Sequence, residues 1–207
     1  MIKMEQITTI GAPSESKFKE KGSLFIGRAF MTESTEEAAE ILAGLKKEFY
    51  DATHHCYAYR NVDGSFKYSD DGEPNGTAGI RILNALDHFN LTNTLVVVIR
   101  YYGGTKLGVG PLGKAYYTSA YNSLESAKKI IKKAYIKILV EADFPDMNYV
   151  HKAAADWDIK IQNSSFDERS HFDCLAEITK ADGFCKELTE LSNGKISAKT
   201  FENRHFI

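Results

Sequence analysis

The sequence predicts an α+β protein of two domains, chiefly because the order of its helical and strand patterns changes half-way along the chain. In the first half, helical patterns alternate with β-rich segments, and the nearly continuous apolar segment Thr94–Tyr102 is expected at the centre of a sheet. In the second half the order is βαββαβ, which is the ferredoxin-like arrangement. The lysine-rich stretch Ala127–Lys133 joins the halves, so we expect one domain at residues 1–130 and another at 131–207.

The first domain opens with a predicted strand and a predicted helix. Ser23–Phe30 is rich in β-forming residues with partial alternation, which is typical of a strand. The helix follows within Thr32–Tyr50, where Ser34 and Glu37 have the spacing of a capping box. One face of this helix is apolar, at Ala38, Ile41, Leu42 and Leu45.

A hairpin and two more helices complete the first domain. His54–Arg60 and Ser65–Ser69 flank the turn sequence Val62–Gly64, which indicates a hairpin. Apolar residues recur at helical spacing in Thr77–Phe89. Lys114–Ala127, after the central strand, is the last predicted helix of this half.

The second domain carries four predicted strands and two predicted helices. The strands are Ala134–Asp143, Ile159–Phe166, His171–Thr179 and Lys195–Phe201. The helices are Phe144–Trp157 and Ala181–Gly194, which gives the βαββαβ order.

Composition describes an ordinary soluble globular protein of 207 residues. The formal net charge of −2 gives no global basic field that would recruit nucleic acid. The three cysteines, Cys56, Cys174 and Cys185, are far apart and lack CxxC spacing, which favours free thiols in a reducing compartment over a structural zinc site. The N-terminus has charges where a signal peptide has an apolar run, and no stretch approaches a membrane span. We therefore expect a cytoplasmic protein with no membrane partner.

The stretch Tyr68–Gly79, with the sequence YSDDGEPNGTAG, places Asp70, Asp71 and Glu73 within four positions. Like charges this close repel one another, so the cluster needs an explanation. A divalent metal site and acid–base chemistry are two functional interpretations. The local alternative is a helix start, where acidic side chains cap free N–H groups and Pro74 opens the helix.

The glycine-rich loop Gly103–Gly113 contains GVGPLG, which matches the letters of a dinucleotide fingerprint but not its context. The segment GGTKL separates these letters from the preceding strand, and no acidic residue closes a second strand at the required distance. The loop places Arg100, Lys106 and Lys114 near backbone N–H groups, an arrangement that suits a phosphate or carboxylate. A tight turn that requires glycine explains the loop equally well.

The segment Thr53–Arg60, THHCYAYR, brings two histidines, a cysteine and an arginine together. Neighbouring strand residues point to opposite faces, so His55 and Cys56 are not expected to form a nucleophile pair. Cys56 is expected to be a small buried residue, and His54 or His55 is a candidate to line a site.

Three blocks, in this order and spacing, resemble the IMPACT (YigZ) family: THHCYAYR, SDDGEPNGTAGIRILNAL and NTLVVVIRYYGGTKLGVGPLGKAY. The resemblance runs from about Ser14 to Leu124, and the second and third blocks are specific to this family. The second half is similar to the small ferredoxin-like domain that follows in bacterial members. The chain departs from the family at Arg81, where proline is common, and at Lys114, where arginine is common.

The resemblance implies a fold and a kind of function. The first domain would be a two-layer α/β unit like the second domain of a small-subunit ribosomal protein, and the second would be like a late domain of elongation factor G. Eukaryotic relatives bind the activator of an amino-acid-starvation kinase, and bacterial relatives are linked to the translation machinery or to nucleic acid. We therefore expect a non-catalytic, cofactor-free binding protein that acts on translation or on its stress regulation.

The resemblance also implies a set of binding residues in the motif loops. In the matched fold the acidic and glycine loops lie at one end of one sheet, so we expect a carboxylate of the first loop to pair with Arg100 or Lys106. The candidate residues are His54, His55, Arg60, Asp70, Asp71, Glu73, Arg100, Tyr101, Gly103, Gly104, Lys106 and Lys114.

Two other functions fit parts of the sequence. One is a metal-assisted hydrolase that uses the carboxylates Asp70, Asp71 and Glu73 with His54 or His55. The other is direct RNA binding by the ferredoxin-like sheet, with aromatic side chains that stack on bases. Aromatic residues of such a sheet also pack on its helices, which is the structural alternative for Tyr135, Phe166, Phe172 and Phe201.

Overall fold

The computed structural model describes residues 4–207, which form two compact units with separate cores. The N-terminal unit spans Thr8–Ile131, and the C-terminal unit combines Lys132–Ile207 with residues 4–7. The α+β, two-domain prediction is confirmed. The domain limits 1–130 and 131–207 stay a prediction, and the structure adds that the start of the chain groups with the second unit.

The N-terminal unit is built on a five-stranded antiparallel sheet in the order β2-β3-β6-β4-β5. Strand β6 occupies the centre, as its apolar sequence predicted, and every residue from Thr94 to Arg100 is buried. The strands are β2 (Ser14–Glu20), β3 (Ser23–Met31), β4 (His54–Arg60), β5 (Phe66–Ser69) and β6 (Thr94–Tyr101).

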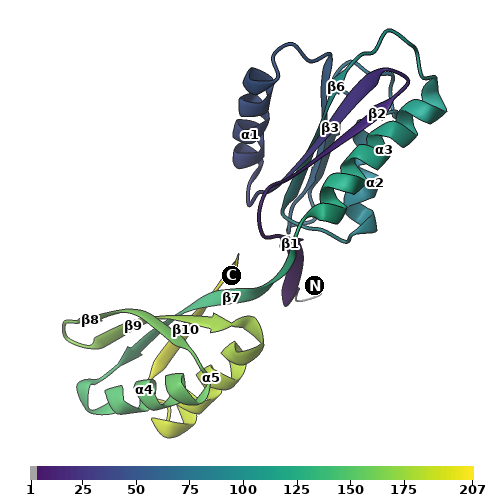
Figure 1. The fold of residues 1–207 in the computed structure, drawn as a ribbon. Helices are drawn as coiled ribbons and strands as arrows, with labels where there is room; N and C mark the ends of the chain where they lie inside the picture. The colour runs from purple at the N-terminus through teal and green to yellow at the C-terminus, as the bar shows by residue number, and fades with distance from the viewer. Residues whose placement is uncertain (1–3) are drawn as a thin grey trace. The chain divides into compact units, whose positions relative to one another are not determined.

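Helices cover both faces of this sheet, with α1 (Thr35–Glu48) on one side and α2 (Gly79–His88) and α3 (Val109–Ser126) on the other (Figure 1). Alternate residues of β6 enter the two cores: Val96 and Val98 pack towards α2 and α3, and the residues between them pack towards α1. The expected two-layer unit is therefore the sheet with α2 and α3, and α1 adds a third layer.

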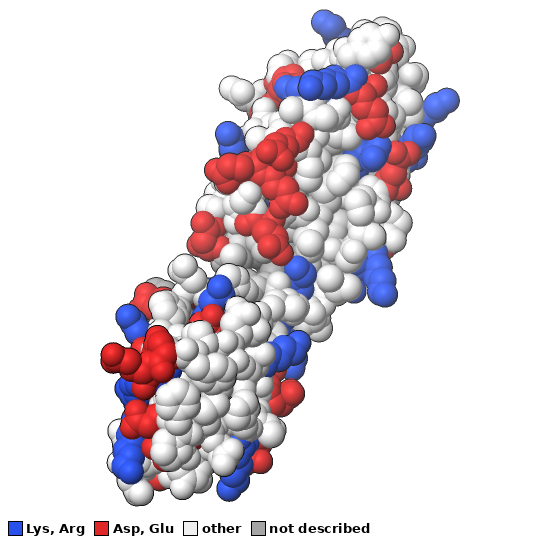
Figure 2. Space-filling model, turned by 90° about the vertical axis from the view of Figure 1, so that its left-hand side faces the viewer, with Lys and Arg blue, Asp and Glu red and all other residues white. Residues whose placement is uncertain are grey.

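Helix α1 begins as its sequence predicted. The Ser34 side chain accepts a hydrogen bond from the Glu37 N–H at 3.1 Å, and the Glu37 carboxylate accepts one from the Glu33 N–H at 2.8 Å. Figure 2 shows acidic side chains gathered on the face of the molecule that carries α1. The exposed glutamates of this helix include Glu36 and Glu40.

The C-terminal unit has the ferredoxin-like order β10-β7-β9-β8, in which all neighbours are antiparallel. Figure 1 shows both of its helices on the same face of this sheet. Strand β1 (Gln6–Ile10) also pairs with β7. The other elements are β7 (Lys129–Ala142), the short 3-10 helix η1 (Phe144–Asp146), α4 (Met147–Asp156), β8 (Lys160–Phe166), β9 (Ser170–Glu177), α5 (Ile178–Leu191) and β10 (Ser197–Phe206).

Two strands and two boundaries differ from the sequence prediction. Strands β1 and β2 were not predicted, the lysine-rich stretch is largely the first part of β7, and α3 begins at Val109 rather than at Lys114. Within residues 4–207, no helix has the length and apolar character needed to cross a membrane.

Candidate functional site

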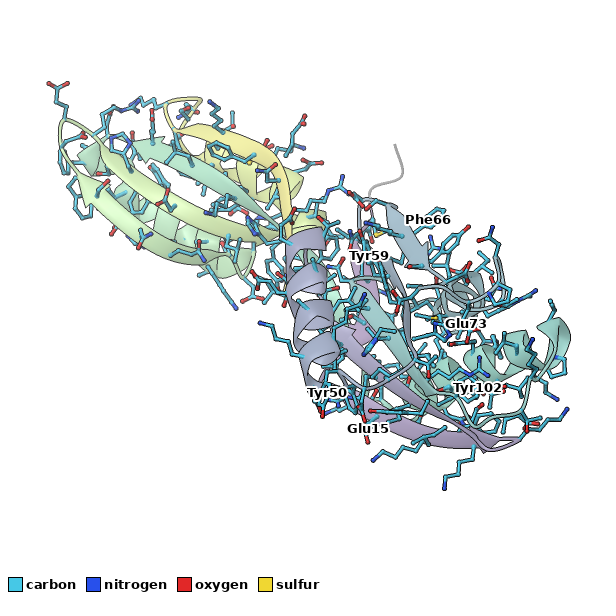
Figure 3. The ribbon with its side chains drawn as sticks, turned by 90° about the horizontal axis from the view of Figure 1, so that it is seen from above. Glu15, Tyr50, Tyr59, Phe66, Glu73 and Tyr102 are labelled. Carbon is cyan, nitrogen blue, oxygen red and sulfur yellow. The ribbon has the colours of Figure 1, made fainter. Side chains whose placement is uncertain are left out.

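The acidic loop and the glycine loop meet at one end of the N-terminal sheet. His54, the first residue of β4, lies opposite Arg100 near the end of β6, so the loops that follow β5 and β6 leave the sheet together. Figure 3 shows Glu73 and Tyr102, one from each loop, lying near each other, and both line the same pocket. The expected meeting of the two loops is therefore observed.

Asp70 caps helix α2. Its Oδ1 accepts hydrogen bonds from the N–H groups of Ala78 and Gly79, at 2.9 and 2.8 Å, and its Oδ2 accepts one from Gly76 at 2.9 Å. A carboxylate at this position satisfies N–H groups that have no partner within the helix and is stabilised by the helix dipole. The helix-start interpretation therefore holds for Asp70, but the prediction that Pro74 opens the helix is wrong, because α2 begins at Gly79.

Asp71 links the acidic loop to strand β4 and helix α1 through its side chain. One carboxylate oxygen accepts the His55 N–H at 2.7 Å, and the other accepts from the Lys46 ammonium at 3.2 Å. Burial raises the pKa of Asp71, but the His55 hydrogen bond and the Lys46 charge outweigh it, so the pKa lies below its usual range. Asp71 has a positive φ of 42°, which fits a tight turn.

Glu73 is the acid that pairs with Arg100. Both side chains are about 95% buried, and one carboxylate oxygen of Glu73 accepts hydrogen bonds from Arg100 Nη1 and, at 2.7 Å, from the Tyr116 hydroxyl. The same oxygen lies 3.7 Å from His54 Nε2. The pairing predicted between the loops is therefore present, and Glu73 rather than an aspartate makes it.

Arg100 lies between two aromatic rings. Its guanidinium carbon is 5.3 Å from the centre of the Phe25 ring and 5.5 Å from that of Tyr102, within the range of a cation–π interaction. Nη2 donates to the Ser23 hydroxyl at 3.3 Å, but the buried Nε has no acceptor among residues 4–207. One donor of this buried cation is therefore unsatisfied.

His54 and His55 lie on opposite faces of β4, and so do His55 and Cys56, as predicted for that pair. His54 is on the pocket side, and its Nδ1 is 2.8 Å from the carbonyl oxygen of Asp71, which fixes the imidazole ring. His55 is buried towards α1, where burial lowers its pKa. Cys56 is fully buried, and burial raises the pKa of its thiol, so the prediction of a buried small residue is confirmed.

Two glycines allow the loop after β6 to pass close to the turn after β2. A Cβ at Gly103 would overlap the backbone of Gly22, and the Gly103 N–H donates to the Ser23 hydroxyl at 3.1 Å. Gly104 has a φ of 84°, a conformation that other residues rarely adopt. The tight-turn interpretation of the loop therefore holds at Gly103 and Gly104.

A pocket of about 500 Å³ lies between the two loops and the start of α3. Its polar lining comes from Thr53, His54, Glu73, Arg100 and Lys106, and its apolar lining includes Pro74, Tyr102, Leu107, Val109 and Leu112. This size and this mixture of lining groups are typical of sites for small ligands.

The family is shown by comparison with known proteins. The model of the Impact N-terminal domain matches residues 21–124. The IMPACT family member YvyE of Bacillus subtilis is 31% identical over 94% of this chain and 90% of its own length, and a Haemophilus influenzae IMPACT family member is 32% identical over 88% and 90%. The chain belongs to the IMPACT family.

Two further comparisons place this IMPACT-family chain. A solved structure, the crystal structure of a hypothetical protein, is 28% identical, has a TM-score of 0.74 and is matched over 97% of this chain and 99% of its own. Protein IMPACT of Rattus norvegicus is 37% identical, but over only 35% of this chain and 25% of its own length. The likeness to this mammalian protein therefore covers about a third of the chain.

Four of the twelve candidate residues line the pocket, namely His54, Glu73, Arg100 and Lys106. Of the eight that do not, Arg60, Tyr101 and Lys114 make contacts elsewhere in the unit. Arg60, at the far end of β4, pairs with Asp87 at 2.6 Å. The Tyr101 hydroxyl donates to Asp51 at 2.8 Å, with its ring in the core towards α1. Lys114 lines a separate hollow.

The three acidic residues of this IMPACT-family chain face different partners. Asp70 binds the start of α2, Asp71 binds β4 and α1, and Glu73 binds Arg100. In the part of the chain that the structure describes, no group of three or more acidic, histidine or cysteine side chains has the arrangement of a metal site. The geometry thus gives the metal-assisted hydrolase no ligand set there.

Sequence reasoning missed three residues that complete the site. Ser23, Thr53 and Tyr116 come from the start of β3, the turn before β4 and the second turn of α3. Each is joined to the motif loops by a hydrogen bond over more than 40 residues of sequence. Thr53 and Tyr116 carried a local signal, because Thr53 opens the first motif block and Tyr116 ends the third, whereas Ser23 lies outside the blocks.

Proposed function

We propose that this chain is a non-catalytic binding protein that acts on translation or on its stress regulation. One observation carries the proposal. The carboxylates of the acidic loop accept hydrogen bonds from other parts of the protein, beside an open pocket. Carboxylates that are engaged in internal hydrogen bonds stabilise the two loops. The outer surface of these loops is then free to contact a partner. Membership of the IMPACT family supports the link to translation.

The proposed partner is a component of the translation machinery or a regulator of it, in the cytoplasm. The exposed Tyr102 and Val109 beside the pocket supply apolar contact area, and Lys106 supplies a charge. Aromatic side chains with few rotatable bonds are common anchors at protein interfaces.

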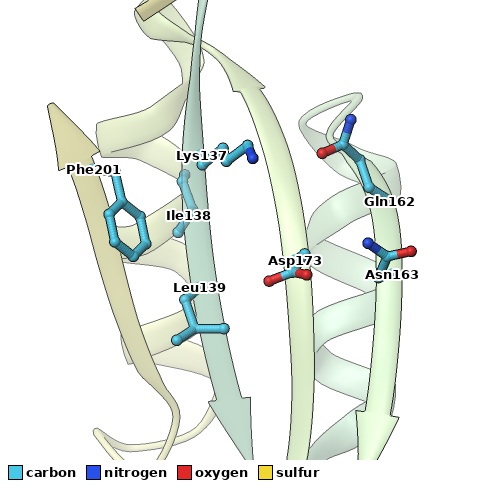
Figure 4. A pocket seen from close by; sticks show the side chains of 7 residues that line it. All are labelled: Lys137, Ile138, Leu139, Gln162, Asn163, Asp173 and Phe201. Atoms are coloured by element: carbon cyan, nitrogen blue, oxygen red, sulfur yellow. The ribbon is translucent and has the colours of Figure 1, made fainter. Parts of the chain in front are cut away.

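RNA is a second proposed partner, and the C-terminal sheet is the surface for it. Figure 4 shows Phe201 beside Leu139 on this sheet, with Lys137 and Asp173 around a hollow of about 380 Å³. Phe201 is 43% exposed and lies 5.7 Å from the Lys199 ammonium, so an aromatic ring and a cation are presented together.

Two of the other predicted aromatics, Phe166 and Phe172, contribute less to an RNA platform. Phe172 is fully buried in the core of the C-terminal unit, so it does not stack on bases. Phe166 is exposed, but its ring contacts Phe172 edge-on. For Phe172, packing against the helices is therefore the correct interpretation.

Co-sedimentation with ribosomes in sucrose gradients, at low and moderate salt, tests the proposal. The native protein is expected to travel with ribosomal particles, and the double variant Tyr102→Ser/Lys106→Gln is expected to stay near the top. The matched control is Tyr50→Ser/Lys47→Gln, which removes the same residue types from an exposed site at the end of α1. Equal sedimentation of the two variants would contradict a role for the pocket surface, and absence of the native protein from the particles would remove the translation link.

A further inference from the structure

The positive end of α3 is the one helix start in the N-terminal unit that no side chain caps. Helix α1 is capped by Ser34, and α2 is capped by Asp70. Helix α3 starts after Gly108, with no side-chain cap and no acidic residue in its first turn. Its first N–H groups, at Val109 and Gly110, have no partner within the helix, so this end keeps its positive partial charge.

Two cationic side chains face the same pocket. Lys106 lines it and forms no ion pair with any residue that the structure describes. Arg100 also lines it, and its side chain is 6% exposed with an Nε that no described residue accepts from. Since Glu73 balances Arg100, the pocket keeps one uncompensated positive charge on Lys106, next to the start of α3.

The rest of the lining is apolar. Val109 and Leu112 come from the start of α3, and Pro74, Tyr102 and Leu107 come from the two loops. Val109 is 69% exposed and Tyr102 is 46% exposed. Removing this apolar surface from water would lower the free energy of the protein. An occupant with an apolar body would cover both.

We propose that this pocket binds a small organic anion, in which a carboxylate or phosphate group is attached to an apolar body. The anionic group lies between the Lys106 ammonium and the N–H groups that open α3, and the body lies against Tyr102 and Leu107. This assignment rests on the proposed function, because it treats the loop cluster as a binding site, and it adds the chemical class of the ligand.

NMR titration of the full chain with phenyl phosphate, benzoate and neutral benzyl alcohol tests the assignment. Saturable amide shifts are expected at Gly104, Gly108, Val109 and Gly110 for at least one anion, and little change is expected for the alcohol. A response to one anion alone identifies the preferred headgroup. Equal shifts with the neutral alcohol, or shifts spread over surface lysines, would overturn the proposal.

Three variants separate the pocket from general surface charge. Lys106→Gln is expected to weaken anion binding about tenfold, since it removes the one uncompensated charge. Lys114→Gln removes the same charge from a neighbouring hollow and is expected to leave affinity unchanged. Val109→Asp places a carboxylate at the start of α3, so it is expected to weaken anion binding while the melting temperature stays level or rises.

The outcomes distinguish this inference from the proposed function. Equal affinity of the Lys106→Gln and Lys114→Gln variants would show that the pocket is not the site, even if the native protein still sediments with ribosomes. Conversely, a Lys106-dependent anion site in a protein that never sediments with ribosomes would support the ligand class and count against the translation partner.

Discussion

Glu73 and Arg100 form the buried ion pair that joins the two motif loops, and its loss has a predictable cost. In the variant Glu73→Gln the Arg100 charge stays buried without a counter-charge, so the free energy of unfolding is expected to fall by about 3 kcal/mol. The control Asp87→Asn breaks the half-exposed pair with Arg60 and is expected to cost less than about 1 kcal/mol. Urea unfolding measures both, and equal costs would contradict a structural role for the buried pair.

At the scale of residues, the sequence predicted which residues take part in the pairing between the loops. It did not predict which acidic residue binds which partner. Three acids within four positions and two nearby cations allowed several pairings, and in the structure the acids are separated by a turn with a positive φ at Asp71. Around that turn, Asp70 faces α2, Asp71 faces β4 and Glu73 faces the core. Local sequence does not contain this information, because each partner lies on a different element.

Helix α2 depends on a cap that lies outside its own sequence. Asp70→Ala would leave three N–H groups without their acceptor, so we expect a loss of roughly 2 kcal/mol in the free energy of unfolding. Hydrogen exchange should show the largest loss of protection in the first turn of α2. Unchanged protection at Gly79 and Ile80 in this variant would show that the helix start is held by other contacts.

At the scale of elements, strongly patterned segments were predicted best. The apolar sequence of β6 placed it at the sheet centre, because only a strand covered on both faces has no need for polar alternation. Strand β2, with the sequence SESKFKE, was missed because it is a charged edge strand of half-buried and exposed residues. The pairing of β1 with β7 was missed because it joins segments more than 100 residues apart.

At the scale of the whole molecule, the two units have separate cores, so damage to one core is expected to stay local. Phe184→Ala empties a fully buried position in the C-terminal unit and is expected to cost about 3–5 kcal/mol there. Native-state hydrogen exchange should then show weaker protection in β7 and β9, while amides of β6 keep theirs. Parallel loss of protection in β6 would show that the units unfold as one.

Because the backbones of Gly22 and Gly103 pass so close together, only the size of the side chain at position 103 decides whether a substitution is tolerated. A substitution scored by growth or binding would fail there whatever its polarity or charge, because the first carbon of any side chain already overlaps backbone. Gly104, one residue on, has open space around it and only an unusual backbone angle, so asparagine and aspartate should be tolerated better than branched residues. In a library of sequence variants, every substitution at position 103 would therefore fail, whereas substitutions at position 104 would be tolerated to different degrees. The contrast between these two adjacent positions would distinguish steric exclusion from backbone strain.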